Sequence, residues 1–425
     1  MKVLWVCNLV LPLFSEIFKL PNTNLGGWLS SSYEELIRNG IDIAVCSPVE
    51  YKTFKKMRYT KYFNENLKCF LFPEFLSHPE RKSKTTKNFL KEIISEYQPD
   101  IVHIHGTEYY HTLALTELLN PNQYVISIQG LVSYIEKSYL LGLPYKIYYK
   151  KTIRDILKND SLYKQKMSLH KRGEFEIQAL KNSKNVIGRT EWDYSCVKLI
   201  NNNIRYFTGN ECIRREFYFH KWDENKCIKH SIFVSQCSSP IKGFHILLES
   251  ISIVKQFYDD VKIYTTGPNL LKMKLYEKQK LPYYQKYLID IINKNDLQNN
   301  IEFLGYLNEK QMVDAMLKSQ VFICCSSIEN SSNAIGEAIQ LSMPIIVSDV
   351  GGNKDIVNSE KVAMIYPANE YYTLAARIIN IFSSNKIDIH YKELNIISNK
   401  RYDRKENIHN LIKIYEKIYR EKNDE

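Results

Sequence analysis

One lysine and two glutamates stand where a chain needs charge to hold an ionic or sugar-like ligand. Lys242 and Gly243 follow the strand-like run SIFV and a polar stretch, and they open a helical pattern. Glu329 and Glu337 lie eight positions apart in CCSSIENSSNAIGEAI, directly after the apolar run VFI. A lysine at such a point is placed to meet phosphate, and carboxylates accept hydrogen bonds from hydroxyl groups. The Walker pattern GxxxxGK[ST] is absent, so this lysine is not that of a P-loop.

Helix capping does not account for either glutamate. A capping box needs Ser, Thr or an equivalent residue three positions before the acid, and Ala334 stands there for Glu337. Asn333 is the better N-cap, which leaves Glu337 one residue past the reciprocal position and Glu329 in the preceding loop. The amides from Ser331 to Ala334 would then form an anion site at a helix N-terminus, with one acid on either side.

Glycines and polar side chains also follow other strand-like runs. Gly26 and Gly27 precede a helical pattern, where paired glycines let backbone amides approach an anion, although an ordinary strand-to-helix turn is the alternative. His105 and Gln129 end the runs DIVHIH and YVISIQ, so each is a candidate for a cleft or for a buried group satisfied by backbone. His103 lies two residues from His105, but no third ligand follows at helical or turn spacing, so we expect no metal.

These residues need a scaffold, and the 425-residue chain supplies a pattern of alternating elements. Short β-branched runs alternate with longer helical segments in two series, which predicts two doubly wound α/β domains with parallel sheets. The first series gives way to the second roughly between Asn201 and Lys229. We interpret this polar stretch as the connection between the two domains. Ligands of such sheets bind at the carboxyl ends of strands, which is where the residues above are expected.

The bulk composition favours a globular protein with anionic partners. Lys and Arg number 58 against 47 Asp and Glu, giving a formal net charge of +11. Residues 137–184 hold twelve basic and four acidic side chains among Tyr and Leu, so this segment could contact an anionic membrane or simply be solvated. No recognition motif accompanies the charge, so nucleic acid is not an expected partner.

Cysteine usage and the N-terminal sequence indicate a reducing, cytoplasmic setting. Nine cysteines are scattered without a CxxC pattern, which argues against a disulfide framework or a zinc site. The opening MKVLWVCNLVLPLF lacks a signal-peptide cleavage site and predicts a buried strand from Val3 to Cys7. No run approaches the roughly 20 apolar residues of a membrane span.

Together, these motifs resemble the retaining glycosyltransferases of family 4, which have the GT-B fold. The resemblance is carried by the Gly-Gly loop, the Lys-Gly turn and E-x7-E before PIIVSDVGG, in that order over nearly the whole chain. The stretch IGRTEWDYS and the later YFTGNECIRREFY are similar to a subgroup linked to bacterial surface-polysaccharide synthesis. The resemblance implies two Rossmann-like domains facing a cleft: residues 1–205 for the acceptor, 206–395 for the nucleotide sugar, and a helix at 396–425 that crosses back to the first domain.

The resemblance also implies a nucleotide-sugar donor between the two domains and a saccharide or lipid-linked acceptor. Lys242 and Glu329 would be the catalytic residues, with Lys242 on the diphosphate and Glu329 near the donor sugar, while Glu337 would accept the ribose hydroxyls. Gly26 and Gly27 would touch the diphosphate from the other domain. The remaining donor-binding positions would be Gln236, Tyr306, Leu307, Ser331, Ser332, Asn333 and Ala334. No metal or other cofactor is implied.

Two positions depart from the family pattern. The usual arginine six residues before the lysine is Gln236, and the usual His-Gly after the fifth strand is Gln129 followed by glycine. Losing a bidentate arginine weakens stabilisation of the departing diphosphate. We therefore expect Arg189 or Arg214, which follow strand-like runs near the interdomain connection, to compensate.

Other functions fit parts of the same pattern. A nucleotide-sugar epimerase can share the GT-B fold, and the two glutamine replacements would suit a catalytically inactive sugar-binding module. For the transferase, the family retains anomeric configuration without a protein nucleophile, so no general base is named. The place of action would be the cytoplasm or the inner face of the membrane, while the sugar, the base and the acceptor are not specified by the sequence.

Overall fold

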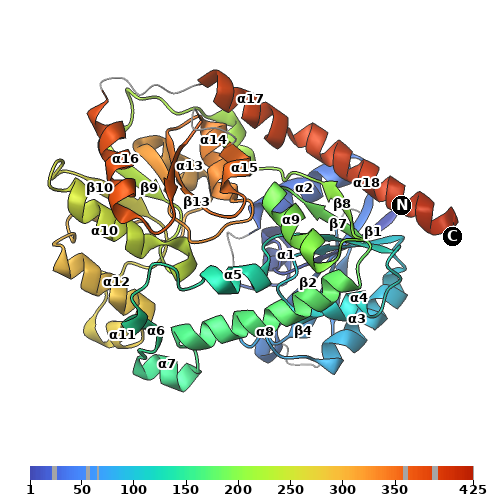
Figure 1. Cartoon of the computed structure of the whole chain (residues 1–425). Coiled ribbons are helices and arrows are strands. Elements are labelled where there is room, and N and C mark those ends of the chain that lie inside the picture. The colour runs from blue at the N-terminus through green and yellow to red at the C-terminus, as the bar shows by residue number, and fades with distance from the viewer. Residues whose placement is uncertain (22–25, 54–57, 65–66, 358–361, 385–390, 425) are drawn as a thin grey trace. The chain divides into compact units, whose positions relative to one another are not determined.

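The chain forms two compact units in the computed structural model, which describes residues 1–21, 26–53, 58–64, 67–357, 362–384 and 391–424. The first unit comprises Met1–Glu136, Ser168–Ile213 and Arg401–Glu425, and the second comprises Lys137–Met167 and Arg214–Lys400. Each unit is built on one mostly parallel sheet with helices around it (Figure 1).

The sheet of the first unit has the strand order β3-β4-β2-β1-β5-β6-β7-β8, and all described pairs are parallel except β3 with β4. The chain passes from one side of β1 to the other after β4, so β1 and β5 flank a topological switch point where ligands bind in such folds. The strands are β1 (Lys2–Cys7), β2 (Asp42–Glu50), β3 (Thr60–Phe63), β4 (Lys68–Glu74), β5 (Ile101–His105), β6 (Tyr124–Ser127), β7 (Asn185–Gly188) and β8 (Arg205–Thr208).

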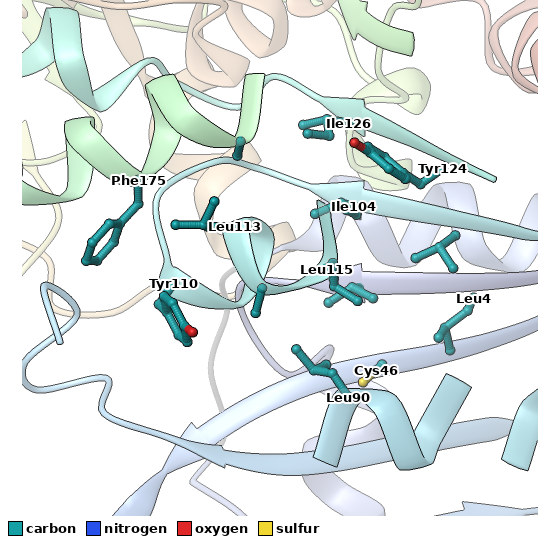
Figure 2. Close-up of a cluster of buried hydrophobic side chains, with 14 of the residues drawn as sticks. Leu4, Cys46, Leu90, Ile104, Tyr110, Leu113, Leu115, Tyr124, Ile126 and Phe175 are labelled. Atoms are coloured by element: carbon teal, nitrogen blue, oxygen red, sulfur yellow. The ribbon is translucent and has the colours of Figure 1, made fainter. Parts of the chain in front are cut away.

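Helices flank this sheet and its loops. They are α1 (Pro12–Ile17), α2 (Gly27–Arg38), η1 (Tyr51–Thr53), α3 (Lys84–Tyr97), α4 (Tyr110–Thr116), α5 (Val132–Ser138), α8 (Leu162–Lys181), α9 (Glu191–Ile200) and α18 (Arg404–Asp424). Strand β1 is buried along both faces, which explains its uninterrupted apolar sequence. Leu4 contributes to one core, shown in Figure 2, and Trp5 to the other.

Helix α18 packs onto the first unit through a buried polar contact. The indole nitrogen of Trp5 donates to the Tyr415 hydroxyl at 2.8 Å, and this hydroxyl lies 2.5 Å from Nδ1 of His103. The other His103 nitrogen lies 2.6 Å from Oγ of Ser127. Burial and the charge of Arg189 lower the pKa of His103 to about 3, so this histidine is a neutral structural group. Arg401–Glu425, which includes α18, groups with the first unit.

The sheet of the second unit is parallel throughout its described pairs, in the order β11-β10-β9-β12-β13-β14. The strands are β9 (Ile228–Val234), β10 (Lys262–Thr265), β11 (Ile301–Phe303), β12 (Ser319–Cys324), β13 (Ile345–Asp349) and β14 (Met364–Pro367). The chain passes from one side of β9 to the other after β11, so β9 and β12 flank the second switch point. The two doubly wound sheets confirm the α/β fold predicted from the alternating runs.

The second unit also contains α6 (Tyr145–Tyr148) and α7 (Ile153–Lys158), which lie in the sequence between β6 and β7 of the first sheet. Its other helices are η2 (Arg215–Phe219), η3 (Pro240–Lys242), α10 (Phe244–Val254), α11 (Leu275–Gln279), α12 (Tyr283–Lys294), α13 (Glu309–Lys318), α14 (Asn333–Leu341), α15 (Asn353–Val357), α16 (Tyr371–Ser383) and α17 (Tyr391–Tyr402). Residues 137–167 group with this unit because the Tyr283 amide donates to Asp155 at 3.0 Å and Nε2 of His245 lies 3.2 Å from the Leu141 carbonyl.

The stretch interpreted from the sequence as a plain connection contains more structure than expected. Strand β8 occupies Arg205–Thr208 and pairs in parallel with β7, and η2 follows at Arg215–Phe219. A strand was not expected there because it is short and sits at the sheet edge, where one face stays partly exposed. The contact boundary between the two units falls between Ile213 and Arg214.

All nine cysteines are free thiols, and eight of them are buried. Among the described residues, no helix has the length and apolar character needed to cross a bilayer. The same part of the chain holds no cluster of three or more ligand-type side chains arranged to bind a metal.

Candidate functional site

The Lys242-Gly243 turn is pressed against the loop that follows β12. Gly243 has φ +65°, and a Cβ on it would lie 1.8 Å from the Cys325 carbonyl oxygen, so only glycine fits. The Ser327 amide donates to the carbonyl of Ile241 at 2.8 Å. The ends of β9 and β12 therefore hold each other in place, and Lys242 is set beside the loop that carries Glu329.

Lys242 and Glu329 form an ion pair. Nζ of Lys242 lies 2.6 Å from Oε1 of Glu329, and Oγ of Ser326 donates to the same oxygen at 2.7 Å. Burial lowers the pKa of Lys242, but the Glu329 carboxylate outweighs this effect, and the net shift is upward. The lysine is therefore charged, while 31% of its side chain stays exposed and able to meet a ligand.

A second glycine turn holds the backbone of Glu329. Gly351 has φ +49°, and a Cβ there would lie 1.9 Å from the Glu329 carbonyl oxygen. The amide of Gly352 donates to that oxygen at 3.0 Å. Gly351 and Gly352 in PIIVSDVGG thus fix the loop that carries Glu329, the first glutamate of E-x7-E.

The second glutamate, Glu337, is paired with Arg214. Nε and NH2 of Arg214 lie 2.6 and 2.8 Å from the two carboxylate oxygens, which is a bidentate geometry. Burial raises the pKa of Glu337, and the charge of Arg214 opposes this effect. The side chains are largely buried, so this pair fixes the first turns of α14 as well as carrying charge.

Helix α14 begins one residue earlier than the predicted cap implies. Its N-cap is Ser332, not Asn333, because Asn333 already has helical geometry. Ser332 makes no side-chain hydrogen bond to the helix, so the N-terminal amides at Asn333 and Ala334 keep their capacity to bind an anion. Glu337 lies two residues past the reciprocal capping position, and capping does not explain it. Ser331 precedes the cap and is half-buried.

The expected base-binding stretch follows β11. The amide of Gly267 donates to the Gly305 carbonyl at 2.9 Å in an isolated antiparallel bridge. No atom of the described residues lies within 4 Å of a Cβ built on Gly305, so its face is open. Tyr306 is 84% exposed, Leu307 is half-buried, and Gln236, in the loop after β9, is exposed.

The first unit holds the other candidates. Gly26, with φ +77°, is the N-cap of α2, whose first residue is Gly27, and a Cβ on Gly26 would lie 2.6 Å from the Leu9 side chain. The preceding loop residues 22–25 lie outside the described part of the chain. His105 ends β5, and neither ring nitrogen has a hydrogen-bond partner within the described residues. Burial lowers the pKa of His105 well below its usual range, so the ring is neutral.

Arg189 pairs with a buried carboxylate, that of Glu211, which no sequence motif marks. Nε2 of Gln129 is buried and has no hydrogen-bond partner among the described residues. Burial raises the pKa of Glu211 to about 7, although the charges of Arg189 and Arg401 act in the opposite direction. The guanidinium of Arg189 also lies 5.5 Å from the Trp28 ring centroid. The stretch NECIRR contains Glu211, but a single acid beside two arginines carries no spacing signal.

The candidates therefore fall into local groups. In the second unit, Lys242 contacts Glu329 and Arg214 contacts Glu337. In the first unit, Arg189 pairs with the buried carboxylate of Glu211. Both arginines proposed as substitutes for the arginine missing at position 236 are engaged with carboxylates, so their action on a diphosphate stays a prediction.

A separate cavity of about 590 Å³ lies in the second unit, lined by the edge strand β11 and the segment before α12. Its lining includes Lys262, Lys272, Lys278 and Glu302, and none of the candidate residues. The cation, carboxylates and helix amides at the β9–β12 switch point remain the arrangement suited to a diphosphate and to sugar hydroxyls.

Comparisons with known proteins bear on the fold and the family. Residues 214–393 match the family described as glycosyl transferases group 1. An uncharacterized glycosyltransferase of Methanocaldococcus jannaschii is 26% identical over 323 residues, which is 70% of each chain. Sucrose-phosphate synthase from Thermosynechococcus elongatus superposes with a TM-score of 0.68 at 10% identity over 99% of each chain. HepE from Anabaena, in complex with UDP and glucose, gives 0.65 at 13% identity over 97% of this chain and 99% of HepE.

These likenesses show the GT-B fold, and the family match lies in the unit that holds Lys242, Glu329 and Glu337. The comparisons support a GT-B glycosyltransferase. The solved structures show the fold, while the sugar transfer, the donor, the stereochemistry and the acceptor belong to the proposal that follows.

Proposed function

We propose that this protein transfers a sugar from a nucleoside-diphosphate donor to a saccharide or lipid-linked acceptor, with retention of configuration and without a metal. The observation that carries the proposal is the Lys242–Glu329 pair, whose loops follow β9 and β12 and are fixed by the glycine turns at Gly243 and Gly351. The solved complex of HepE with UDP and glucose supports a nucleotide-sugar donor.

In this proposal, the chain stabilises the charge that develops on the departing diphosphate. The Lys242 ammonium and the N-terminal amides of α14 face that charge, and both are set in place before the reaction. Lys242 exchanges its Glu329 partner for a phosphate oxygen when the donor binds. Glu329 is then free to accept hydroxyls of the donor sugar, and Glu337, oriented by Arg214, accepts the ribose hydroxyls.

The transfer itself exchanges one bond for another at the anomeric carbon. The acceptor oxygen forms a bond to that carbon on the face from which the diphosphate oxygen leaves, which preserves the configuration. The leaving phosphate takes the acceptor proton, so no protein base is assigned. Gln236 donates a neutral hydrogen bond where the family has an arginine, and Arg189 or Arg214 supplies the missing charge.

The proposed setting is the synthesis of a surface polysaccharide in the cytoplasm or at the inner membrane face. Its support is the resemblance of the stretches around Arg189 and Arg214 to that subgroup, together with the basic excess of residues 137–184. A lipid-linked acceptor would place the reaction at a membrane surface.

The test is a thermal-shift panel of UDP-, GDP- and ADP-sugars, followed by an assay of diphosphate release with the stabilising donor. A bound donor raises the melting temperature by mass action, and slow hydrolysis releases the nucleoside diphosphate. Lys242→Ala is expected to lose both effects. Interconversion of the sugar without release would indicate an epimerase, and binding without any turnover would indicate an inactive module. No shift with any donor would overturn the proposal.

A further inference from the structure

Helix α7 presents its apolar residues to solvent and its acid to the protein. Ile153 is 78% exposed and Leu157 is 81% exposed, and Ile156 is exposed beside them, whereas Asp155 is only 2% exposed. Positions i, i+3 and i+4 of a helix share a face, so the three apolar side chains form one exposed patch. In a helix that packs onto a core, the pattern is the reverse.

The inward acid explains why the apolar face is turned outward. Asp155 forms a capping box with Thr152, in which its carboxylate accepts from the Thr152 amide at 3.0 Å. The same carboxylate oxygen accepts from the Tyr283 amide at 3.0 Å, at the first residue of α12. Arg154 pairs with Asp155 at 3.1 Å and with Asp160 at 2.6 Å. These polar contacts hold α7 against the second unit and leave no apolar side chain to anchor it.

Exposed aromatic rings extend the patch along the chain. Tyr145 and Tyr149 are exposed with ring centroids 5.4 Å apart, and Tyr149 and Tyr163 are 5.5 Å apart. The three rings form a connected row that begins at α6 and ends at the start of α8. Tyrosine suits a boundary between apolar and aqueous media, because its ring is apolar and its hydroxyl is polar.

The charge around the patch has one sign. Residues 137–167 contain eight Lys and Arg and two Asp, a net charge of +6. Both acids are engaged by Arg154, and Asp155 is buried, so neither is available to a partner. The exposed basic side chains include Lys146, Lys150, Lys151, Lys158 and Lys164. A partner of this surface must therefore be anionic at its face and apolar just beneath.

We propose that α6, α7 and the start of α8 form a docking surface for an anionic lipid bilayer. Ile153, Ile156 and Leu157 enter the boundary between headgroups and acyl chains, the tyrosines lie at the headgroup level, and the lysines contact the anionic headgroups. A protein partner would need an acidic rim around an apolar groove. A second copy of this chain offers instead the same basic surface, which would repel it. This inference rests on the membrane setting proposed above and deepens it by naming the contact surface, and its test does not require sugar transfer.

The experiment is vesicle co-sedimentation of the full chain without any donor. Vesicles of phosphatidylcholine alone are compared with vesicles that also contain phosphatidylglycerol, at low and high salt. We expect binding to the anionic vesicles only, weakened by salt. Ile153→Ser/Ile156→Ser/Leu157→Ser is expected to lower the partition coefficient by about tenfold or more. Lys146→Glu/Lys150→Glu/Lys151→Glu is expected to lower it by more than about tenfold.

Two control variants distinguish the effect of this patch on vesicle binding from a general effect of exposed apolar or basic residues. Leu199→Ser/Phe257→Ser/Ile396→Ser removes three exposed apolar side chains that lie outside residues 137–167, and it should bind vesicles like the wild type. Lys294→Glu/Lys310→Glu removes exposed charge elsewhere in the second unit and should have a small effect. Melting temperatures verify that every variant is folded.

Three outcomes would overturn the proposal. The first is no binding to anionic vesicles. The second is a loss of binding in the lysine variant without any loss in the apolar variant, which would reduce the contact to charge alone. The third is dimerisation of the wild type, seen by light scattering and abolished by the serine variant, without vesicle binding. Because the assay contains no nucleotide sugar, failure here leaves the proposed transfer to be judged by its own test.

Discussion

The ammonium of Lys242 lies 2.6 Å from the carboxylate of Glu329, so the two residues proposed to hold the donor neutralise each other. The two charges stand on loops that follow different strands, and two glycines fix the second loop from either side. Under the proposed function, donor binding divides this pair, with the diphosphate taking the lysine and the sugar taking the glutamate.

Separate substitutions of the pair should affect binding and turnover differently. Lys242→Ala is expected to weaken UDP or GDP binding and to lower kcat by at least about 100-fold, because it removes the charge that faces the leaving group. Glu329→Gln keeps the shape and removes the competing charge, so diphosphate affinity should stay the same or rise while kcat falls. Calorimetry and turnover with the preferred donor measure both quantities. Equal losses of nucleotide affinity in both variants would contradict the division of roles.

The Arg214–Glu337 pair predicts a loss that is specific to the ribose. Glu337→Gln should weaken binding of a nucleoside diphosphate but leave binding of inorganic pyrophosphate unchanged, because only the ribose hydroxyls lose their acceptor. A nucleotide without the ribose 2′- and 3′-hydroxyls should bind the wild type and the variant equally.

The same substitution should also lower stability. Removing one partner of a buried pair leaves an uncompensated charge, which costs about 3–5 kcal/mol when the partner is lost completely and less when an amide remains. Arg214→Met/Glu337→Gln should recover part of the melting temperature. If pyrophosphate binding falls as much as nucleotide binding, Glu337 acts through the fold of α14 and not through the ribose.

Gly243 should not tolerate alanine. The substitution adds a Cβ 1.8 Å from the Cys325 carbonyl at a left-handed φ of +65°, so the turn must move, at a cost of at least about 2 kcal/mol. Gly40→Ala is the control, because Gly40 has φ +77° and no atom of the described residues lies within 4 Å of the added Cβ. This control should lose only about 1 kcal/mol of backbone origin. Thermal or urea unfolding compares the two, and equal losses would mean that the clash with the β12 loop has no consequence.

The raised pKa of Glu176 predicts that the free energy of unfolding decreases as the pH rises towards neutrality. It is fully buried and accepts from Thr107 and from the amides of Val132 and Ser133, and burial raises its pKa from 4.5 to about 7. The folded state keeps this proton between about pH 4.5 and 7 while the unfolded state loses it, so the free energy of unfolding decreases across that window, by up to about 3 kcal/mol.

Unfolding of the wild type and of Glu176→Gln at pH 5 and pH 7.5 checks this direction. The variant should show a shallower fall, because its side chain cannot ionise. A residual fall is expected from Glu211, whose pKa is raised in the same direction. A wild-type stability that increases steadily from pH 5 to 7 would contradict the prediction.

The sequence predicted the scaffold well because buried parallel strands leave a direct signal. The run VLWVC is apolar at every position since both faces of β1 are covered, and the loops that matter follow such runs. The same logic placed the paired glycines and Lys242 in loops that follow strands. It did not reveal the contacts that require glycine at these positions. Gly243 and Gly351 are required by carbonyl oxygens of residues 325 and 329, which no local pattern reveals.

Other features were beyond the sequence because they depend on contacts far along the chain. Glu211 meets its partner Arg189 only when the first unit folds. The exposure of Ile153 and Leu157 contradicts the ordinary expectation for apolar residues in a helix, and only the buried Asp155 explains it. The observed N-cap of α14, Ser332, differs by one residue from the predicted Asn333, because Ser and Asn are nearly equivalent as N-caps.

The hydroxyl of Tyr415, which joins Trp5 to His103, has a consequence for the order in which the protein is made. The ribosome completes β1 and β5 hundreds of residues before it reaches α18, and the whole second unit is synthesised in the interval. Until α18 arrives, the indole nitrogen and the imidazole have no partner on that side, and the core around Trp5 stays open. The first unit to emerge is therefore the last to close, and a chain stalled anywhere before α18 exposes that apolar face to chaperones and proteases.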